Sequence, residues 1–263
     1  MNIFLINYLY IDLNMELTNK VAIITGGGTG IGKATAQIFA REGAAVVLAG
    51  RRRGPLSTTA AQIVESGGRA EVVVTDVSEA AQVQFLFDRA VDVFGKIDIL
   101  FNNAGVFTSG KLAHEYCEDE WERILRVNFF GTFLCSKYVV PHMIRNGGGV
   151  IINCSSVSGR LPQRLQAPYN VSKAAIEMMS KCMCLELGPS NIRVNTICPN
   201  LTETDMSESA IAANGREKYE STIPLRRIGQ PTDTAYAALY LASDRASWIS
   251  GNSLFVDGGS CPR

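Results

Sequence analysis

The sequence has no excess of charge of either sign, because 25 Lys and Arg residues balance 25 Asp and Glu residues. A nucleic-acid surface needs a basic excess or stripe to neutralise phosphates, and the tightest basic run here is only Arg51, Arg52 and Arg53. We therefore expect no nucleic-acid partner. Charged residues make up 19% of the 263 residues and hydrophobic residues 46%, which excludes a disordered chain and a coiled coil.

Patterns for metal binding and disulfide bonding are also missing. The seven cysteines include no CxxC pair, and no spacing of cysteine and histidine matches a zinc site. The two histidines, His114 and His142, have no carboxylate at ligand spacing, so we expect surface or core roles for them and no metal site. An odd set of thiols is typical of a reduced cytoplasmic protein.

No hydrophobic run is long enough to cross a membrane. Residues 1–14 are apolar but are interrupted by Asn2, Asn7 and Asp12, and they fall short of the roughly 20 residues that a span needs. They contain no Lys or Arg, which a signal peptide would carry. We expect residues 1–14 to be an extension outside the fold, with an extra packed strand or helix as the alternative, and residues 15–263 to form one domain.

Short apolar runs alternate with longer amphipathic segments along the rest of the chain. The runs predict strands at residues 21–25, 45–50, 70–75, 97–102, 149–155, 192–197 and 253–256. The segments between them predict helices near residues 31–42, 55–66, 79–94, 116–145, 168–187 and 231–242. Because most strands are continuously apolar, helices should cover both faces of the sheet. The sequence therefore predicts a doubly wound (Rossmann) α/β fold with a parallel sheet of about seven strands, which binds ligands at the carboxyl ends of its strands.

A glycine-rich turn joins the first predicted strand to the first helix. It consists of Gly26, Gly27, Gly28, Thr29, Gly30, Ile31 and Gly32. Glycine allows a tight turn and lets backbone amides approach a diphosphate, and the helix amino terminus adds positive partial charge. Turn glycines at an ordinary helix start are the alternative. The strand, turn and helix context of a dinucleotide fingerprint is present, however, and favours a dinucleotide cradle.

Tyr169 and Lys173 stand four residues apart in a predicted helix, so their side chains share one face. A tyrosine ordinarily keeps its proton up to about pH 10, but a neighbouring ammonium favours the phenolate, so the pair can exchange protons near neutrality. Ser156, at the mouth of the preceding strand, can hydrogen-bond a substrate oxygen as charge develops on it. Ser155 is the rival for this role, although strand alternation should turn it to the other face. Taken singly, these residues would fit a solvated helix face and ordinary turns.

The glycine spacing TGxxxGxG resembles that of the short-chain dehydrogenase/reductase family. The family's later motifs follow in order: Asn102 to Gly105, then Asn128, Ser156, Tyr169 with Lys173, and VDGG at residues 256–259. The resemblance runs from about Lys20 to Gly259 and is strongest to 3-oxoacyl carrier-protein reductases and to sugar or polyol dehydrogenases. It implies an enzyme that interconverts a secondary alcohol and a ketone on a small or acyl-linked substrate.

The resemblance also implies roles for four catalytic residues, Asn128, Ser156, Tyr169 and Lys173. Tyr169 would exchange the proton with the substrate oxygen, and Ser156 would polarise that oxygen. Lys173 would also hold the nicotinamide ribose, and Asn128 would position a water in the proton relay. The alternative is a regulatory protein that binds NADP without turnover, although the intact catalytic set favours the enzyme.

We expect the cofactor to be NADP(H), with NAD(H) possible. Where an acidic residue would bond the ribose of NAD, the second strand is followed by Arg51 and Arg52, which can bind a 2′-phosphate; arginines that only face solvent are the alternative. By the resemblance, Asp76 would bond the adenine amine and Val77 would back the ring. The full set of expected cofactor contacts is Gly26, Thr29, Gly30, Ile31, Arg51, Arg52, Asp76, Val77, Asn102, Ala104, Gly105, Tyr169, Lys173, Pro199 and Thr204.

One departure from the family follows the sixth strand. The family usually has Gly after Pro199, whereas this chain has Asn200, which tolerates the left-handed conformation and so could keep the turn. Ile197 in that strand would pass beside the nicotinamide carboxamide.

The region between residues 200 and 225 is polar and able to form helices, as expected of a lid that closes over the ligand. The candidate wall residues of the substrate pocket are Phe107, Arg160, Leu161, Gln163 and Met206. The resemblance further implies a cytoplasmic homotetramer, with the helices near 116–145 and 168–187 and the last strand at its interfaces.

Overall fold

The computed structural model describes residues 15–261, so the extension expected at residues 1–14 lies outside the described part. Seven parallel strands form one sheet in the order β3-β2-β1-β4-β5-β6-β7. The strands are β1 (Val21–Thr25), β2 (Ala45–Gly50), β3 (Arg69–Val74), β4 (Ile99–Asn102), β5 (Gly149–Cys154), β6 (Ile192–Pro199) and β7 (Ser253–Val256). The predicted doubly wound sheet in a single domain is confirmed.

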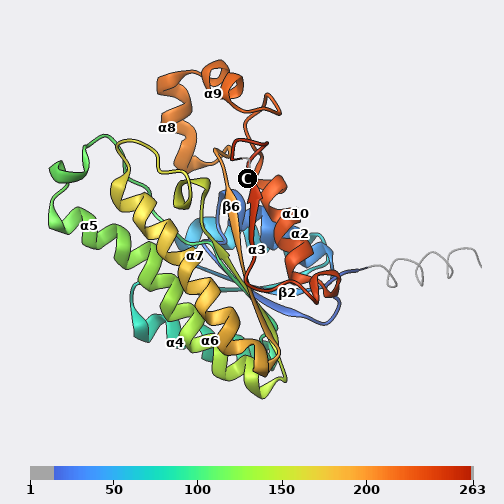
Figure 1. Cartoon of the computed structure of the whole chain (residues 1–263). Helices are drawn as coiled ribbons and strands as arrows, with labels where there is room; N and C mark the ends of the chain where they lie inside the picture. Colours follow the sequence, from blue (N-terminus) through green and yellow to red (C-terminus); the bar gives the residue numbers. More distant parts are fainter. Residues whose placement is uncertain (1–14, 262–263) are drawn as a thin grey trace, which may run out of the picture.

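Helices cover both faces of this sheet, as continuously apolar strands require. The helices are α2 (Gly30–Arg41), α3 (Arg53–Glu65), α4 (Ala80–Phe94), α5 (Glu118–Leu125), α6 (Gly131–Arg145), α7 (Ala167–Leu187), α8 (Asp205–Asn214), α9 (Arg216–Thr222) and α10 (Pro231–Ala242). In Figure 1, α2, α3 and α10 lie on one side of the sheet and α4, α6 and α7 on the other. Within residues 15–261, no helix is long and apolar enough to cross a membrane.

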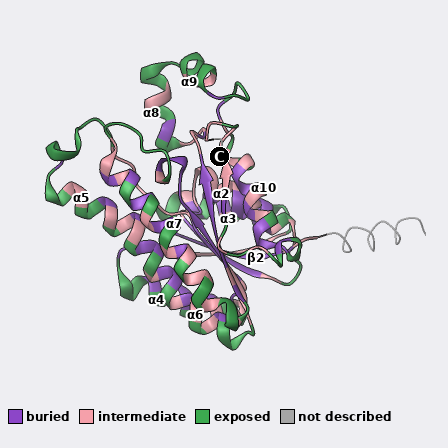
Figure 2. Cartoon of the chain, viewed as in Figure 1, coloured by how far each residue is buried: buried purple, intermediate pink, exposed green. Residues whose placement is uncertain are grey.

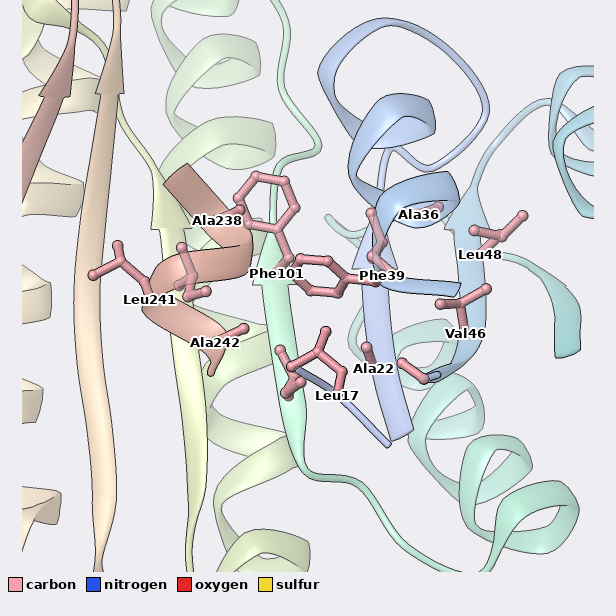
Figure 3. Packing of buried hydrophobic residues seen from close by; sticks show 14 of the residues in the cluster. Leu17, Ala22, Ala36, Phe39, Val46, Leu48, Phe101, Ala238, Leu241 and Ala242 are labelled. Carbon is pink, nitrogen blue, oxygen red and sulfur yellow. The ribbon is translucent and has the colours of Figure 1, made fainter. Parts of the chain in front are cut away.

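Two hydrophobic clusters hold the three layers together. Figure 3 shows the first, which includes Phe39 of α2, Phe101 of β4 and Leu241 of α10. The second fills the opposite face, where Phe87 of α4 and Met143 of α6 pack against the sheet. The strands are mostly buried, whereas the outer helix faces and most of α8 and α9 are exposed (Figure 2).

The strand order reverses at the centre of the sheet, between β1 and β4. Chains that leave neighbouring strands in opposite directions open a crevice at the carboxyl ends of those strands, which is where such sheets bind ligands. Helices α8 and α9 follow β6 and rise beyond this edge of the sheet (Figure 1).

Sequence periodicity placed the strands within two residues of their observed bounds, and likewise the helices other than α8 and α9, for which no bounds were predicted. The exception is the helix predicted over residues 116–145, which is divided into α5, a π-helical turn over Arg126–Phe130, and α6. The Thr132 hydroxyl donates to the Asn128 carbonyl across this turn at 2.7 Å. A single π turn lies within an otherwise continuous helical segment, and the sequence analysis did not predict it.

Candidate active site

A cavity of about 790 Å³ opens at the carboxyl edge of the sheet. Its walls come from the turns that follow β1 to β6 and from α7, α8 and α9. This is the crevice expected of the fold, and it contains most of the site residues predicted from the sequence.

The glycine turn forms one end of the cavity. Gly26 and Gly30 have φ values of +69° and +52°, in the left-handed region that favours glycine, and both line the cavity together with Thr29 and Ile31. A Cβ atom on Gly26 would lie 2.8 Å from Asn103 Nδ2, and one on Gly30 would lie 2.9 Å from Thr204 Cγ2. Helix α2 begins at Gly30, so its unpaired amides face the same space. The turn therefore fits the diphosphate of a dinucleotide.

Both predicted arginines line the cavity beyond the end of β2. The guanidinium of Arg52 lies 3.9 Å from the carboxylate of Asp205 in α8, and both side chains are largely exposed. Arg51 lies near Asp76, which follows β3. In the described chain, no carboxylate directly follows β2, at the position where one would accept a hydrogen bond from a ribose hydroxyl.

Asp76 and Val77 form the adjoining wall. The carboxylate of Asp76 accepts hydrogen bonds from the Ser78 hydroxyl at 2.7 Å and the Ser78 amide at 3.0 Å. Burial by itself would raise the pKa of Asp76, but these two bonds and the positive charge of Arg51 bring that pKa below its ordinary value. Asp76 is therefore a carboxylate at neutral pH, with one oxygen less engaged and able to accept from an amine.

Asn102 does not line the cavity, contrary to the sequence analysis. Its side chain is buried in the sheet, where Nδ2 donates to Ser136 Oγ and to Asn153 Oδ1. Asn103 takes the place expected for it and donates to the Thr25 carbonyl at 3.0 Å. Ala104 and Gly105 line the cavity as predicted. Because β4 ends at Asn102, the next residue leaves the sheet towards the ligand side, a signal available from the strand boundary alone.

Ser156, Tyr169 and Lys173 line the same cavity. Lys173 is 4% exposed, and its ammonium donates to the Cys154 carbonyl at 2.8 Å and lies 5.6 Å from the centroid of the Tyr169 ring. The Phe107 ring, which also lines the cavity, meets the Tyr169 ring edge-on, with 5.1 Å between centroids. The arrangement places a fixed cation beside a phenol that faces the cavity.

Ser156 and Ser155 both line the cavity, but their hydroxyls differ in what they can still do. Ser155 Oγ donates to the Lys173 carbonyl at 2.9 Å, so its proton is already used. Ser156 Oγ accepts from the Ser158 amide at 3.1 Å and keeps its proton for a ligand oxygen. Strand alternation is not the reason for this difference, because β5 ends at Cys154 before either serine.

Asn128 is fully buried in the π-helical turn and does not line the cavity. Its amide oxygen accepts from the Val106 amide at 2.8 Å, and its Nδ2 donates to the Val106 carbonyl and to Ser172 Oγ. A Cβ atom on Gly105 would lie 3.3 Å from Asn128 Oδ1 and 3.7 Å from Lys173 Nζ, so both groups stand behind Gly105. Asn128 thus holds the segment after β4 against α7.

The segment after β6 forms a further part of the cavity wall, next to the glycine turn. Pro199 and Thr204 line the cavity as predicted, whereas Ile197 is fully buried and does not. Asn200 also lines the cavity, but it does not adopt the left-handed conformation suggested by its replacement of a glycine. Its Nδ2 instead donates to Ser260 Oγ at 2.8 Å, which ties the carboxyl-terminal segment to the cavity wall.

Among the candidate residues for the substrate pocket, Phe107, Gln163 and Met206 line the cavity, and Arg160 and Leu161 do not. The guanidinium of Arg160 points away from it and pairs with the buried carboxylate of Glu177 at 3.1 Å. Its sequence position suggested that Arg160 lies beside the site. The side chain instead turns towards Glu177 of α7, a partner that the sequence could not indicate.

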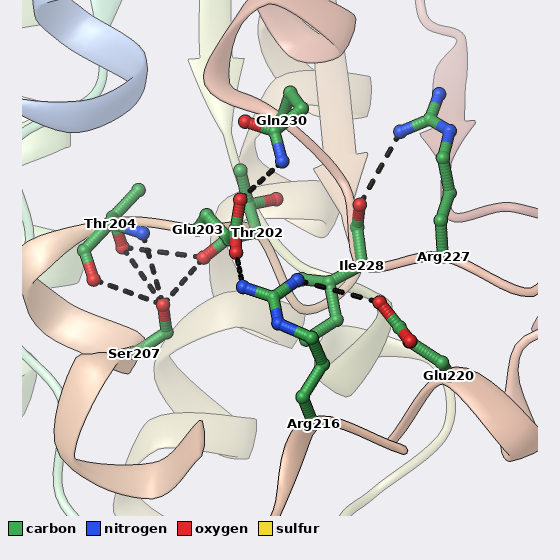
Figure 4. Close-up of polar contacts among 9 residues, drawn as sticks. All are labelled: Thr202, Glu203, Thr204, Ser207, Arg216, Glu220, Arg227, Ile228 and Gln230. Carbon is green, nitrogen blue, oxygen red and sulfur yellow. Dashed lines mark hydrogen bonds and ion pairs between the residues drawn. The ribbon is translucent and has the colours of Figure 1, made fainter. Parts of the chain in front are cut away.

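The predicted insert at residues 200–225 contains two helices, α8 and α9, as its helix-forming composition indicated. Figure 4 shows the polar contacts at its base. Arg216 of α9 pairs with Glu203 and, at 3.4 Å, with Glu220, while Gln230 donates to Glu203. Ser207 Oγ bonds the Thr202 and Thr204 carbonyls, which fixes the first turn of α8. The insert is therefore anchored at both ends.

Thiol and metal chemistry find little support in this cavity. Cys154 lines it, but burial raises the pKa of its thiol despite the opposing charge of Lys173, so the nucleophilic thiolate is disfavoured. Over residues 15–261, no group of three or more His, Cys, Asp or Glu side chains could hold a metal ion. A proton-transfer centre beside a dinucleotide cradle is what the geometry supports.

Known proteins share this architecture over most of the chain. A family model described as Enoyl-(Acyl carrier protein) reductase matches residues 26–260. An uncharacterised oxidoreductase of Bacillus subtilis is 43% identical over 251 residues, which cover 93% of this chain and 92% of the relative. A 3-oxoacyl-[acyl-carrier-protein] reductase of Thermotoga maritima is 38% identical, with 93% and 99% covered. A short-chain type dehydrogenase/reductase from Mycobacterium marinum superposes with a TM-score of 0.90 at 34% identity, over 96% of this chain and 100% of the other.

Proposed function

The chain belongs to the short-chain dehydrogenase/reductase family, and on that premise we propose that it transfers a hydride between NADP(H) and a secondary alcohol or ketone, with Tyr169 as acid and base. One observation carries the proposal: the Tyr169 and Ser156 hydroxyls and the Lys173 ammonium share one cavity with the glycine turn. The bound nicotinamide supplies or accepts the hydride at the substrate carbon.

In the direction of reduction, the carbonyl oxygen of the substrate accepts hydrogen bonds from Ser156 and Tyr169. As negative charge develops on this oxygen, the Ser156 hydroxyl stabilises it and Tyr169 gives it a proton. The phenolate left on Tyr169 is stabilised by the Lys173 ammonium, which the Cys154 carbonyl holds in place. Oxidation of the alcohol reverses each transfer, with the phenolate as base. We assign to Asn128 the positioning of a water in the proton relay.

NADP(H) is the proposed cofactor, and NAD(H) is the alternative cofactor for the same binding site. Arg51 and Arg52 are the groups proposed for the 2′-phosphate, because guanidinium groups bind phosphate in charge-assisted pairs. The cradle that we propose consists of Gly26, Thr29, Gly30, Ile31, Asp76, Val77, Asn103, Ala104, Gly105, Pro199 and Thr204, with Lys173 on the nicotinamide ribose.

The test uses purified protein, NADPH or NADP, and a panel of ketones and secondary alcohols, followed by the absorbance of the reduced nicotinamide. The panel includes a 3-oxo thioester and the matching α,β-unsaturated thioester, so that carbonyl reduction is separated from reduction of a carbon–carbon double bond. Tyr169→Phe should lower kcat by about 10²–10⁴-fold and leave NADPH binding nearly intact. Turnover retained in this variant would refute the acid–base assignment, and NADPH binding without turnover of any compound would favour a regulatory protein.

The proposal extends to the surroundings of the site. The insert at residues 200–225 is proposed as a lid that excludes water, since α8 and α9 line the cavity and are otherwise exposed. A homotetramer is supported by exposed apolar side chains on α6 and α7, including Phe133 and Met178, and sedimentation analysis tests it. A cytoplasmic location is supported by the seven cysteines, all free in the structure.

A further inference from the structure

The wall of the cavity contributed by residues 206–223 divides into an apolar part and a polar part. Met206, Ala210 and Ile223 form the apolar part, and Phe107, whose ring meets that of Tyr169, lines the same cavity. Asn214, Lys218, Tyr219 and Thr222 form the polar part at the end of α8 and along α9. Helices α8 and α9 lie beyond the carboxyl edge of the sheet (Figure 1), so a substrate that extends from the catalytic hydroxyls towards α9 reaches the polar part away from the sheet.

The polar part offers two hydrogen-bond donors to a ligand. Asn214 Nδ2 donates to the Tyr219 hydroxyl at 3.1 Å, so that oxygen already accepts a bond and its proton remains available. The second donor is the ammonium of Lys218, which precedes Tyr219 in the sequence. It forms no ion pair with any group of residues 15–261. By contrast, Thr222 Oγ1 donates to the Tyr219 carbonyl and is not free to donate.

The charge of Lys218 is not cancelled on this wall. Among the lining residues between 206 and 223, Lys218 is the only one with a charged side chain. Of the nearby carboxylates, Glu203 and Glu220 pair with Arg216, and Asp205 lies by Arg52 at the cofactor side. Glu217 adjoins Lys218 in the sequence but does not line the cavity. This end of the cavity therefore presents positive charge and a hydroxyl proton, a combination that favours an anion.

We infer that Lys218 and Tyr219 bind an anionic group, a carboxylate or a phosphate, at the end of the substrate remote from the reacting carbon. The inference rests on the proposed function, because it defines the class of alcohol or ketone that the site prefers. The preferred substrate is a ketone with an apolar segment beside Phe107 and Met206 and an anionic terminus that reaches α9.

The test compares matched pairs of ketones that differ only in the terminal charge. A series of methyl ketones with a terminal carboxylate and increasing chain length is assayed beside the corresponding methyl esters. A second arm pairs a hydroxy-ketone with its phosphate monoester, which separates carboxylate from phosphate recognition. For the best chain length, Lys218→Gln should raise the KM of the anionic compound about tenfold and leave the KM of its neutral counterpart unchanged. Calorimetric binding of the carboxylate to the enzyme with NADP provides a readout independent of turnover.

Two further variants distinguish the site from a general effect of charge on the lid. Glu217→Gln changes a charge of the same helix at a side chain that does not line the cavity, and it should leave the acid-to-ester ratio unaltered. Tyr219→Phe should raise the KM of the anionic compound alone. In the wild type, added salt should reduce the preference for the anionic compound over its neutral counterpart. Equal use of acid and ester in both wild type and Lys218→Gln would overturn the inference while the proposed function stands. If the enzyme turns over neither the anionic nor the neutral ketones, the proposed function is overturned, and the inference with it.

Discussion

The hydroxyl of Ser155 donates a 2.9 Å hydrogen bond to the backbone carbonyl of Lys173, so the end of β5 is tied to the catalytic helix α7. The ammonium of the same lysine returns to the Cys154 carbonyl at 2.8 Å. These two bonds hold the strand that presents Ser156 against the helix that presents Tyr169. The adjacent serines therefore divide two tasks, structural support and contact with the substrate.

This division predicts different consequences for the two serine variants. Ser156→Ala removes a hydroxyl that still has its proton to donate, so kcat should fall by about 10²–10³-fold while NADPH binding is kept. Ser155→Ala removes a buried tie and should lower the free energy of unfolding by about 1 kcal/mol, with a much smaller loss of kcat. Steady-state kinetics and urea titration of both variants provide the measurement. A larger loss of kcat in Ser155→Ala than in Ser156→Ala would reverse the assignment.

Replacement of Arg51 should change the choice of cofactor. Without its guanidinium a 2′-phosphate loses a charge-assisted partner, so Arg51→Ala should lower kcat/KM for NADPH by about 10–100-fold and leave the value for NADH nearly unchanged. Arg53→Ala is the matched control, because Arg53 begins α3 and does not line the cavity. If Arg51→Ala lowers kcat/KM equally for NADPH and NADH, the arginine acts on folding or on the part that the two cofactors share.

The fold was predictable because its determinants are local. Continuously apolar strands such as residues 21–25 and the glycine turn after them are visible in the sequence, and both recur at the expected places. The convergence of Ser156, Tyr169 and Lys173 on one cavity followed from their positions at strand and helix ends. At these positions the local sequence pattern and the tertiary structure agree, because the direction in which the backbone leaves each strand decides where the residue lies.

Side-chain direction in loops was not predictable in the same way. Asn102 and Asn103 are an exception, because the predicted end of the strand at residue 102 could have shown which of the two reaches the cavity. Arg160 is turned away from the site by Glu177, which lies on a different element. Lys218 and Tyr219 belong to a region without a sequence motif, so their place on the wall depends on how α9 folds over the cavity.

The Arg160–Glu177 pair should contribute to stability. The Glu177 side chain is 5% exposed, and its Oε2 accepts from Arg160 and from Ser253 Oγ, while its Oε1 has no hydrogen-bond partner. Arg160→Met leaves a buried carboxylate without its cation, so the free energy of unfolding should fall by about 1–3 kcal/mol. Glu177→Gln removes the charge and keeps the shape, and its cost should be smaller.

Urea titration of the two single variants and of the double variant Arg160→Met/Glu177→Gln measures the coupling. The loss in the double variant should be smaller than the sum of the single losses by about 1 kcal/mol, because the uncompensated charge is then absent. Additive losses would mean that the two side chains do not stabilise one another.

Mild acid should destabilise the fold through His142. Burial, together with the positive charge of Arg145, lowers the pKa of His142 below its ordinary value of 6.5, and Arg145 Nη2 lies 2.9 Å from the ring Nδ1, which must be unprotonated to accept. The unfolded chain therefore takes up the proton at a higher pH than the folded chain. The contribution of neutral His142 is complete above about pH 6.5 and is lost as the pH falls through the folded pKa.

Urea titrations at several values between pH 8 and pH 5 follow this loss. In His142→Gln the decline of the unfolding free energy over this range should be shallower than in the wild type. His114, the other histidine of the chain, is exposed, and His114→Gln is the matched control that should keep the wild-type slope. Equal slopes in the wild type, His142→Gln and His114→Gln would place the acid sensitivity at carboxylates instead, because the chain has no third histidine to titrate.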